Sequence, residues 1–586
     1  MADPAGGRQT PPEFAEARAH ARTGRSGEAA DRYRACIARH PGFLPAYVEL
    51  AQLRAHDDPA GARRLLMTAL TLAHDAPAAR SAIARMLAAL IAPLSPDIYD
   101  ADLEAQLVAC LDDPALDPQP LAQTAAELLL LKYPVVDAEA AAHDPLWHAF
   151  LARCRNTLPA MEPRIAALRR HVLTHDDSRL DPLAAALALE CFASGYVLPV
   201  TPEEIELLNE YSRASGNPGV RTARSETLDS RLRGVDGGAS ASATLRRAMV
   251  APLIDLDTPP PPLTSPLVAA LVKRTLTDLA EERALAAALP SVGATSRSAS
   301  QHVRAQYESH PYPRWQTPPT PRPADLRALI ERLPGINHAA LPPAPLATLI
   351  AGCGTGYEAI DLARTDPSLA ITAIDLSRAS LAFAQRNAAE LGLGAIAFVQ
   401  GDLLDLGAER FDLITATGVL HHLADPLEGL RTLTAVLAPG GVMRIALYSR
   451  RARALVREAH ALITARGWQG DDGIRALRAH ILALAPEAPL ARLTESDDFW
   501  SLSGCRDLLF HVLEHQFDVP EITRMIDTAG LKWIGIDASP EAQHLFRARF
   551  GDTSPLDPQK WDSLEADHPA LFAGMVPLWC QKPVSP

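Results

Sequence analysis

Short apolar runs that alternate with helix-length segments characterise the second half of the chain, after the proline-rich stretch 317–323. A parallel sheet with crossover helices requires this alternation, because each strand is buried and the chain must return along a face of the sheet before the next strand begins. The first run, Leu346 to Ala351, leads directly into Gly352-Cys353-Gly354-Thr355-Gly356. The sequence therefore predicts an α/β domain in which a glycine loop joins the first strand to a helix.

The glycine loop indicates a ligand that approaches the backbone, because glycine has no Cβ and adopts dihedral angles that other residues resist. It is not a Walker phosphate loop, since no Gly-Lys-Ser/Thr follows it. Residues 354–359 also satisfy a relaxed dinucleotide pattern, so the loop alone leaves a dehydrogenase open. The second predicted strand, Ile371 to Ile374, ends at Asp375, where a carboxylate can accept hydrogen bonds from the ribose of any bound nucleoside.

The later strands add motifs at their ends in a fixed order. They are Ala395 to Gln400 followed by Gly401-Asp402-Leu403, Phe411 to Ile414 followed by Gly418 to Leu423, and residues 436–441 followed by Val442 to Tyr448. We expect Phe517 to Gly530 to form a helix. Leu531 to Ile536 and Met575 to Cys580 are then the last two strands, joined as an antiparallel hairpin. The predicted fold is an α/β Rossmann-like core with a seven-stranded sheet.

This succession of motifs resembles class I S-adenosylmethionine-dependent methyltransferases over about 110 residues. The resemblance implies S-adenosylmethionine as the cofactor, its methionine part on the glycine loop, its ribose on Asp375 and its adenine amino group near Asp402. The predicted cofactor-binding residues are Gly352, Cys353, Gly354, Gly356, Asp375, Leu376, Asp402, Leu403 and Tyr307. In one departure, Ile350 occupies a position where the family often has an acid that serves the cofactor's amino group.

Two further segments, Tyr307 to Trp315 and Asp498 to His511, resemble a bacterial group of these enzymes with tetratricopeptide-like amino-terminal helices. Tyrosines, an arginine and a tryptophan interrupted by prolines make the first segment rigid and suited to lying over a cofactor pocket as part of a lid. The alternative is that it only packs helices onto the sheet.

Methyl transfer is an in-line displacement, so a general base is needed only where the acceptor carries a proton. The predicted catalytic residues are His421, His422, Tyr448 and His511. His511 and His515 are four residues apart, which would place both on one helical face, but a lone HxxxH pair is common by chance and we predict no metal site. Strand four is not followed by Asn-Pro-Pro-Tyr or Asp-Pro-Pro-Tyr, which disfavours methylation of nucleic-acid bases.

The first half of the chain is predicted to be all-helical. Residues 12–92 show hairpins with a period near 34, in which Ala17, Ala29, Tyr33 and Cys36 match the small and aromatic positions of a tetratricopeptide repeat. We therefore divide the chain into repeats at 1–92, a further helical domain at 93–300, where Thr201 and Glu204 form a capping box, and a methyltransferase domain at 301–586 with an insertion at about 451–515. A protein or peptide acceptor held by the repeats is favoured over a small molecule, and a non-catalytic cofactor-binding scaffold is the third alternative.

Composition limits the partners and the compartment. The 586 residues carry a formal net charge of −14 without a lysine- and arginine-rich run, which disfavours nucleic acid as a partner. The seven cysteines are scattered and never spaced as CxxC, so we expect a reducing compartment. No signal peptide or long apolar span is recognisable, and the protein is expected to be cytoplasmic, with no membrane partner and an oligomeric state that the sequence leaves open.

Overall fold

The computed structural model describes residues 10–214, 241–256, 258–293 and 297–584. The chain divides into two compact units. The helical unit comprises Met1–Glu190, Thr201–Val250 and Thr258–Leu271, and the sheet unit comprises Cys191–Val200, Ala251–Asp257 and Val272–Pro586. The predicted division into three domains stays a prediction. No helix in the described ranges is both long and apolar enough to cross a membrane.

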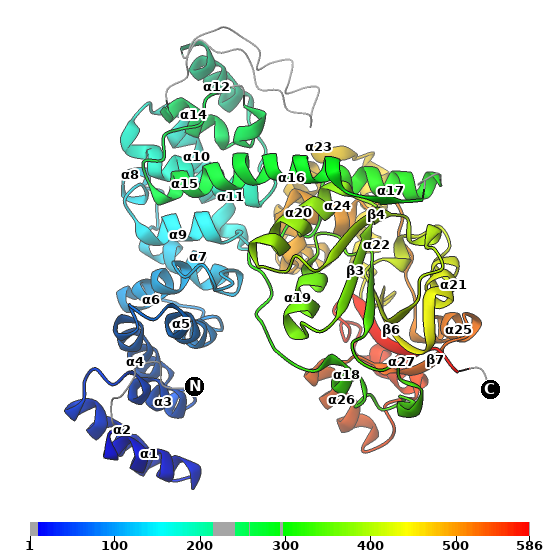
Figure 1. The fold of residues 1–586 in the computed structure, drawn as a ribbon. Helices are drawn as coiled ribbons and strands as arrows, with labels where there is room; N and C mark the ends of the chain where they lie inside the picture. The colour runs from blue at the N-terminus through cyan, green and yellow to red at the C-terminus, as the bar shows by residue number, and fades with distance from the viewer. Residues whose placement is uncertain (1–9, 215–240, 257, 294–296, 585–586) are drawn as a thin grey trace. The chain divides into compact units, whose positions relative to one another are not determined.

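The helical unit begins with paired helices (Figure 1). They are α1 (Pro12–Arg22), α2 (Ser26–Arg39), α3 (Leu44–Arg54), α4 (Pro59–Leu72) and α5 (Pro77–Ile91). Proline starts α1, α4 and α5, where its missing N–H costs nothing. α1 packs on α2 and α3 on α4, and Ala17, Ala29 and Cys36 are fully buried, because only small side chains let two helices approach closely. The helical hairpins are confirmed, whereas their tetratricopeptide identity stays a prediction.

More helices complete this unit. They are α6 (Ala101–Leu111), α7 (Ala122–Lys132), α8 (Ala138–Ala141), α9 (Pro145–Arg153), α10 (Glu162–Thr174), α11 (Asp181–Ala193), α12 (Pro202–Ala214), α14 (Ala241–Ala248) and α15 (Pro266–Val272). The predicted capping box is confirmed, since the Thr201 N–H donates to Glu204 and the Glu204 N–H donates to the Thr201 hydroxyl. Glu204 also accepts two hydrogen bonds from the buried Arg169, which ties α12 to α10.

The sheet unit contains eight strands in the order β1-β4-β3-β2-β5-β6-β8-β7. They are β1 (Ser291–Val292), β2 (Ala347–Ala351), β3 (Ala370–Asp375), β4 (Ala397–Gly401), β5 (Phe411–Thr417), β6 (Leu437–Tyr448), β7 (Lys532–Ile536) and β8 (Met575–Gln581). β8 runs antiparallel between β6 and β7, and the other pairs are parallel. The predicted seven strands correspond to β2–β8. The eighth, β1, is a two-residue edge strand with no apolar run to mark it in the sequence.

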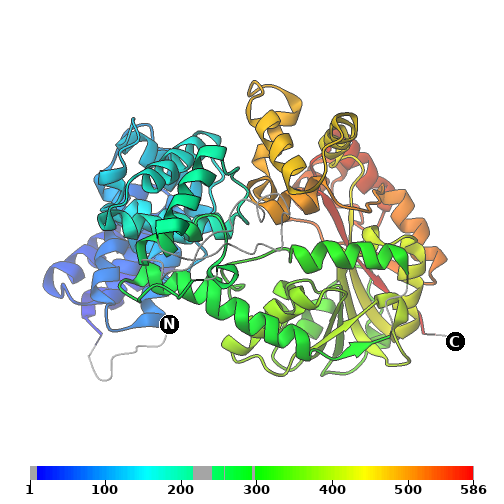
Figure 2. The same cartoon turned by 90° about the horizontal axis from the view of Figure 1, so that it is seen from above.

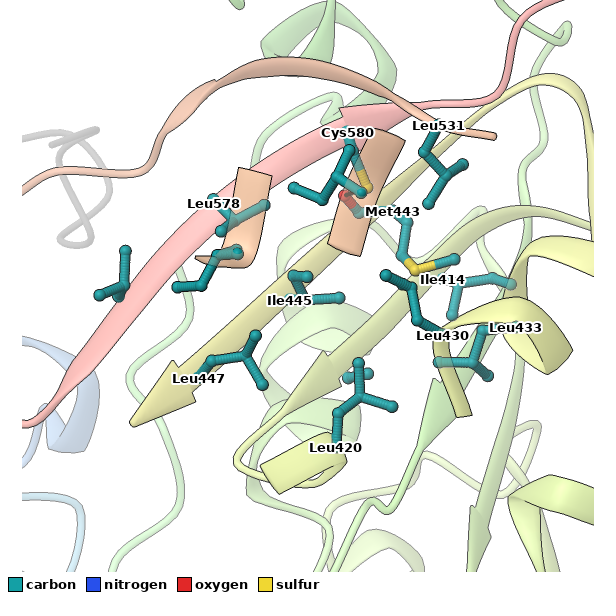
Figure 3. Close-up of a cluster of buried hydrophobic side chains, with 14 of the residues drawn as sticks. Ile414, Leu420, Leu430, Leu433, Met443, Ile445, Leu447, Leu531, Leu578 and Cys580 are labelled. Atoms are coloured by element: carbon teal, nitrogen blue, oxygen red, sulfur yellow. Dashed lines mark hydrogen bonds between the residues drawn. The ribbon is translucent and has the colours of Figure 1, made fainter. Parts of the chain in front are cut away.

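Helices cover both faces of this sheet (Figure 1). They are α16 (Asp278–Ala288), α17 (Ser298–Ser309), α18 (Leu326–Ile330), α19 (Tyr357–Thr365), α20 (Arg378–Glu390), α21 (Pro426–Val436), α25 (Val519–Thr528), α26 (Pro540–Phe550) and α27 (Pro558–Asp567). Strand alternation puts Leu349 and Ala351 into one core, part of which Figure 3 shows around Ile414, Met443 and Leu578, and Ile350 into the core with α19 and α20. The last two strands are not a hairpin, because α26 and α27 lie between them in sequence.

The predicted insertion is a helical group with its own core. It contains α22 (Ala454–Arg466), α23 (Gly470–Leu482) and α24 (Leu502–Leu509), drawn in yellow and orange in Figure 2. Ile474, Leu477 and Phe499 are buried together in its core. His511 and His515 follow α24 in irregular backbone, so the expectation of one helical face was wrong. The helix predicted at Phe517 to Gly530 is the shorter α25, which Asp518 and Glu521 cap.

Candidate active site

A cavity of about 430 Å³ opens at the carboxyl ends of β2, β3, β4, β5 and β6, within the range of small-ligand sites. All of its lining residues belong to the sheet unit. We call its two parts the glycine end and the tyrosine end. The glycine end is lined by Gly352, Cys353, Gly354, Asp375, Leu376, Asp402 and Leu403, and the tyrosine end by Tyr307, Tyr312, His422, Tyr448 and Asp507.

Backbone geometry shapes the glycine end. Gly352 has φ 69°, and a Cβ on it would lie 2.4 Å from a methyl group of Val419, so no larger residue fits there. The Gly354 N–H donates to Oδ2 of Asp375 at 2.8 Å, and the Ser377 N–H donates to Oδ1 at 2.8 Å. Burial raises the pKa of Asp375 to about 6. The loop and this carboxylate are therefore fixed relative to each other.

Gly356 was also predicted to bind the cofactor, but it does not line the cavity. It has φ 79° and caps α19, and a Cβ on it would lie 2.5 Å from the Cβ of Ala384. Its structural role is close packing of α19 and α20, which is the function that the third glycine of such loops has in related folds.

Asp402 follows β4 at the far side of the glycine end. It is 2% exposed, its Oδ1 accepts from the Leu404 N–H, and Arg297 lies 3.7 Å from its Oδ2. Arg297 also binds Asp405 at 2.7 Å, and it lines the cavity as well. Arg297 was not among the predicted site residues, because nothing near it in the sequence marks it as part of a ligand site.

Residues 307–315 lie against the glycine loop. The Thr355 hydroxyl donates to the Pro313 carbonyl, and the Trp315 indole N–H donates to the Thr355 carbonyl at 3.2 Å. Tyr307, Tyr312 and Pro313 line the cavity, whereas Trp315 packs against Phe383 on α20. The segment therefore lines the cavity on one side and packs against α20 on the other, and its role as part of a lid over the cofactor stays a prediction.

Asp507 is the central group of the tyrosine end. It is 6% exposed, and its Oδ1 accepts a hydrogen bond of 2.6 Å from the Tyr307 hydroxyl. His511 lies behind Tyr307, with its Nε2 3.3 Å from the same hydroxyl, and its Nδ1 accepts from the Leu513 N–H. Since Nδ1 is an acceptor, the proton of neutral His511 is on Nε2, and it points to the Tyr307 oxygen.

His421 and His422 differ in their access to the cavity. His422 donates from Nδ1 to the Leu513 carbonyl at 2.8 Å, so its Nε2 is an acceptor, and the residue lines the cavity. His421 does not line it, because it is fully buried, stacks 3.7 Å from the Tyr448 ring and accepts from the Tyr448 N–H. Arg453 covers the other face of that ring at 3.6 Å. Tyr448 is therefore sandwiched and presents its edge and hydroxyl to the cavity.

Burial determines the protonation states at the tyrosine end. It raises the pKa of Asp507 to about 7, lowers the pKa of His422 to about 4 and lowers that of His511 to about 3. Both histidines are consequently neutral at physiological pH. Asp507 is half ionised near neutrality, and sequence reasoning did not single it out although it lies in the segment 498–511.

His422, Asp507 and His511 each offer a ligand atom within 4.8 Å of the others, a spacing that a metal ion could use. The tautomer of His511 argues against this use, because its Nε2 carries the proton that faces Tyr307. The absence of a metal site stays a prediction.

Ile350 packs into the core with α19 and α20, so it cannot contact a ligand in the cavity. Glu358 lines the cavity instead, and its carboxylate accepts from the Thr417 hydroxyl at 3.3 Å and from Arg444 at 3.4 Å. An acid is therefore present near the loop, but it comes from the first turn of α19 and not from the strand.

The chain matches the methyltransferase domain family over residues 349–443. It is 34% identical over 314 residues to the uncharacterized protein syc1184_c of Synechococcus sp., covering 48% of this chain and 73% of that protein. It is also 40% identical over 112 residues to the ubiquinone biosynthesis O-methyltransferase of Caulobacter vibrioides, which covers 19% of this chain and 44% of the relative, less than half of its length. Among solved structures, PKMT2 from Rickettsia typhi in complex with AdoHcy is similar at 14% identity and a TM-score of 0.35, over 46% of this chain and 56% of that one.

The family match covers β2 to β5 and the loops that follow them, and the methyltransferase and cofactor predictions are confirmed. Four glycines, Gly352, Gly354, Gly401 and Gly418, leave bare backbone along the cavity wall, and Asp375 presents its carboxylate beside them, so the residues present fit S-adenosylmethionine. The chain belongs to the family of the Synechococcus protein, and it is an S-adenosylmethionine-dependent methyltransferase.

Proposed function

We propose that the acceptor atom enters at the tyrosine end and receives the methyl group there. The observation that carries this proposal is the single cavity, which has the cofactor motifs at one end and Tyr307, Tyr448, His422 and Asp507 at the other. When bound at the glycine end, S-adenosylmethionine supplies an electrophilic methyl group on a sulfonium.

The residues of this chain align and desolvate the reactants. Asp375 accepts from the ribose hydroxyls, while Tyr307, Tyr312 and Pro313 cover the reacting groups and exclude water. Where the acceptor carries a proton, Asp507 and Nε2 of His422 are the acceptors in the cavity wall. Tyr448 orients the acceptor with its hydroxyl. His421 and His511 position their neighbours and do not touch the reactants.

We further propose a protein or peptide acceptor that the amino-terminal helices hold. The support is the series of helical hairpins, which α1 to α4 form with small buried residues at the contacts, as tetratricopeptide-like arrays do. The seven cysteines are all free thiols, which favours a reducing, cytoplasmic location.

A small-molecule acceptor is the second candidate. The relative from Caulobacter vibrioides acts as an O-methyltransferase in ubiquinone biosynthesis, and the cavity has the volume of a small-ligand site. Incubation of the full chain with methyl-labelled S-adenosylmethionine and a cell extract separates the two, since label in the protein fraction favours the first and label in the low-molecular-weight fraction favours the second.

Calorimetric titration with S-adenosylmethionine, S-adenosylhomocysteine and NADH tests the cofactor site. We expect binding of both sulfur nucleosides, no binding of NADH, and loss of binding in Asp375→Ala. Glu409→Ala, an exposed acid of the same unit, is the matched control. Failure of the unmodified chain to bind either sulfur nucleoside would refute the proposal.

A further inference from the structure

The charges around the cavity are strongly unbalanced. Among the described residues, its lining contains the acids Glu358, Asp375, Asp402, Glu428 and Asp507 but one lysine or arginine, Arg297. Arg297 is already paired with Asp402 and Asp405, and Glu358 lies beside Arg444. Asp375 serves the ribose, and Glu428 is exposed at the rim. The remaining buried carboxylate in the wall is Asp507.

Asp507 has no cationic partner. Within the described part of the chain no lysine, arginine or histidine forms an ion pair with it, and its Oδ2 has no hydrogen-bond donor. The charge of Arg453 acts on Asp507 and lowers its pKa, but Arg453 donates two hydrogen bonds to Glu514, at 2.8 and 2.6 Å, and covers the Tyr448 ring. Its other neighbours, Tyr307, Tyr312, Tyr448, Asp498, His422 and His511, are neutral or acidic groups. The cost of burying this carboxylate exceeds what the Tyr307 hydrogen bond and the charge of Arg453 recover, so a ligand that brings a positive charge would stabilise its ionised form.

We propose that the methyl acceptor is an amine, which enters as an ammonium ion and is held by Asp507 at the tyrosine end. This inference rests on the proposed function and adds the chemical class of the acceptor. A phenol brings no positive charge to Asp507, and a carboxylate acceptor brings a second negative charge beside it, so both are disfavoured.

The ammonium N–H gives its proton to Asp507, which changes from carboxylate to carboxylic acid, and the nitrogen keeps the electron pair. That pair forms the new N–C bond while the methyl C–S bond breaks and its electrons stay on sulfur. The product is a methylated ammonium ion, and the proton on Asp507 leaves to water, with Nε2 of His422 as the neighbouring acceptor.

Binding of benzylamine, benzyl alcohol and benzoate tests the chemical class of the acceptor. The three compounds carry the same aromatic ring with a cation, a neutral hydroxyl and an anion, respectively. The full chain is saturated with S-adenosylhomocysteine at about pH 8, where Asp507 is ionised and benzylamine is still a cation, and a chelator is present to remove metal ions. We expect benzylamine to bind about tenfold more tightly than benzyl alcohol, and benzoate not to bind.

Asp507→Asn removes the charge and keeps the size, and we expect it to abolish the preference for benzylamine. The matched control is Asp497→Asn, an exposed acid in the same insertion, which should behave as the unmodified chain. Equal or tighter binding of benzyl alcohol or benzoate, binding of none of the three, or an unchanged preference in Asp507→Asn overturns the proposal. Binding of S-adenosylhomocysteine is measured on the same samples, so its loss in the unmodified chain marks failure of the proposed function itself.

Discussion

The wall of the glycine end is mostly backbone, whereas the wall of the tyrosine end is mostly buried side chains. At the glycine end, Gly352 and Gly354 expose their peptide groups and one carboxylate, Asp375, is held by two backbone N–H donors. At the tyrosine end, Tyr307, Asp507 and His511 hold one another through side-chain hydrogen bonds. A backbone site can be kept while sequences diverge around it, but a side-chain network changes whenever one member changes. This difference explains how one fold keeps its cofactor and varies its acceptor.

The largest expected effect is at the glycine end. Asp375→Ala removes the proposed ribose acceptor and leaves the N–H groups of Gly354 and Ser377 without this partner. We expect the Kd for S-adenosylhomocysteine to rise by about 100- to 1,000-fold, or roughly 3 to 4 kcal/mol. Calorimetry on folded protein measures this change. A rise below tenfold would show that the carboxylate shapes the loop without contacting the ligand.

Gly356→Ala separates packing from binding within the same loop. The new Cβ would lie 2.5 Å from Ala384, at a backbone φ of 79°. We expect a loss of roughly 2 to 3 kcal/mol in the free energy of unfolding from this strain and overpacking. Because Gly356 does not line the cavity, the Kd for S-adenosylhomocysteine of the folded variant should change by less than about twofold. Denaturant unfolding and calorimetry give the two values, and a large change in Kd with unchanged stability would contradict the packing role.

The pH dependence of the free energy of unfolding of Asp507→Asn tests the charge state of the tyrosine end. The folded pKa of about 7 lies above the ordinary value of 3.8, so the folded state retains a proton between these pH values that the unfolded state releases. The stability of the unmodified chain therefore falls as pH rises through this window, and the asparagine variant does not share that loss. At about pH 8 we expect the variant to be more stable by about 2 kcal/mol, and at about pH 4 to be equal to the unmodified chain. Lower stability of the variant at the higher pH would show that Asp507 is paired with a cation.

The sequence located the glycine end because each of its motifs is a short contiguous run that follows a strand. Gly352, Gly354, Asp375 and Asp402 all line the cavity. The tyrosine end was predicted only in part. Tyr307 and Asp507 are 200 residues apart and meet only after the insertion folds, so Asp507 carried no local signal. Local motifs also misplaced two residues. The glycine motif placed Gly356 at the ligand, but it packs α19 against α20 outside the cavity, and no motif marked Arg297, which lines the cavity.

The smallest expected effect concerns the pH dependence of cofactor binding, which distinguishes the two ends by their different pKa values. Asp375 has a pKa of about 6, so it takes up a proton as pH falls below that value, which weakens it as the proposed acceptor for the ribose. We expect the Kd for S-adenosylhomocysteine to be constant above about pH 7 and to rise about tenfold, or 1.4 kcal/mol, at about pH 5. Asp507→Asn should show the same profile, because the carboxylate that it removes is at the tyrosine end. Asp375→Ala should bind S-adenosylhomocysteine weakly at every pH. A profile centred near pH 7 that disappears in Asp507→Asn would mean that the two ends titrate as one site, and the separation between them would then be wrong.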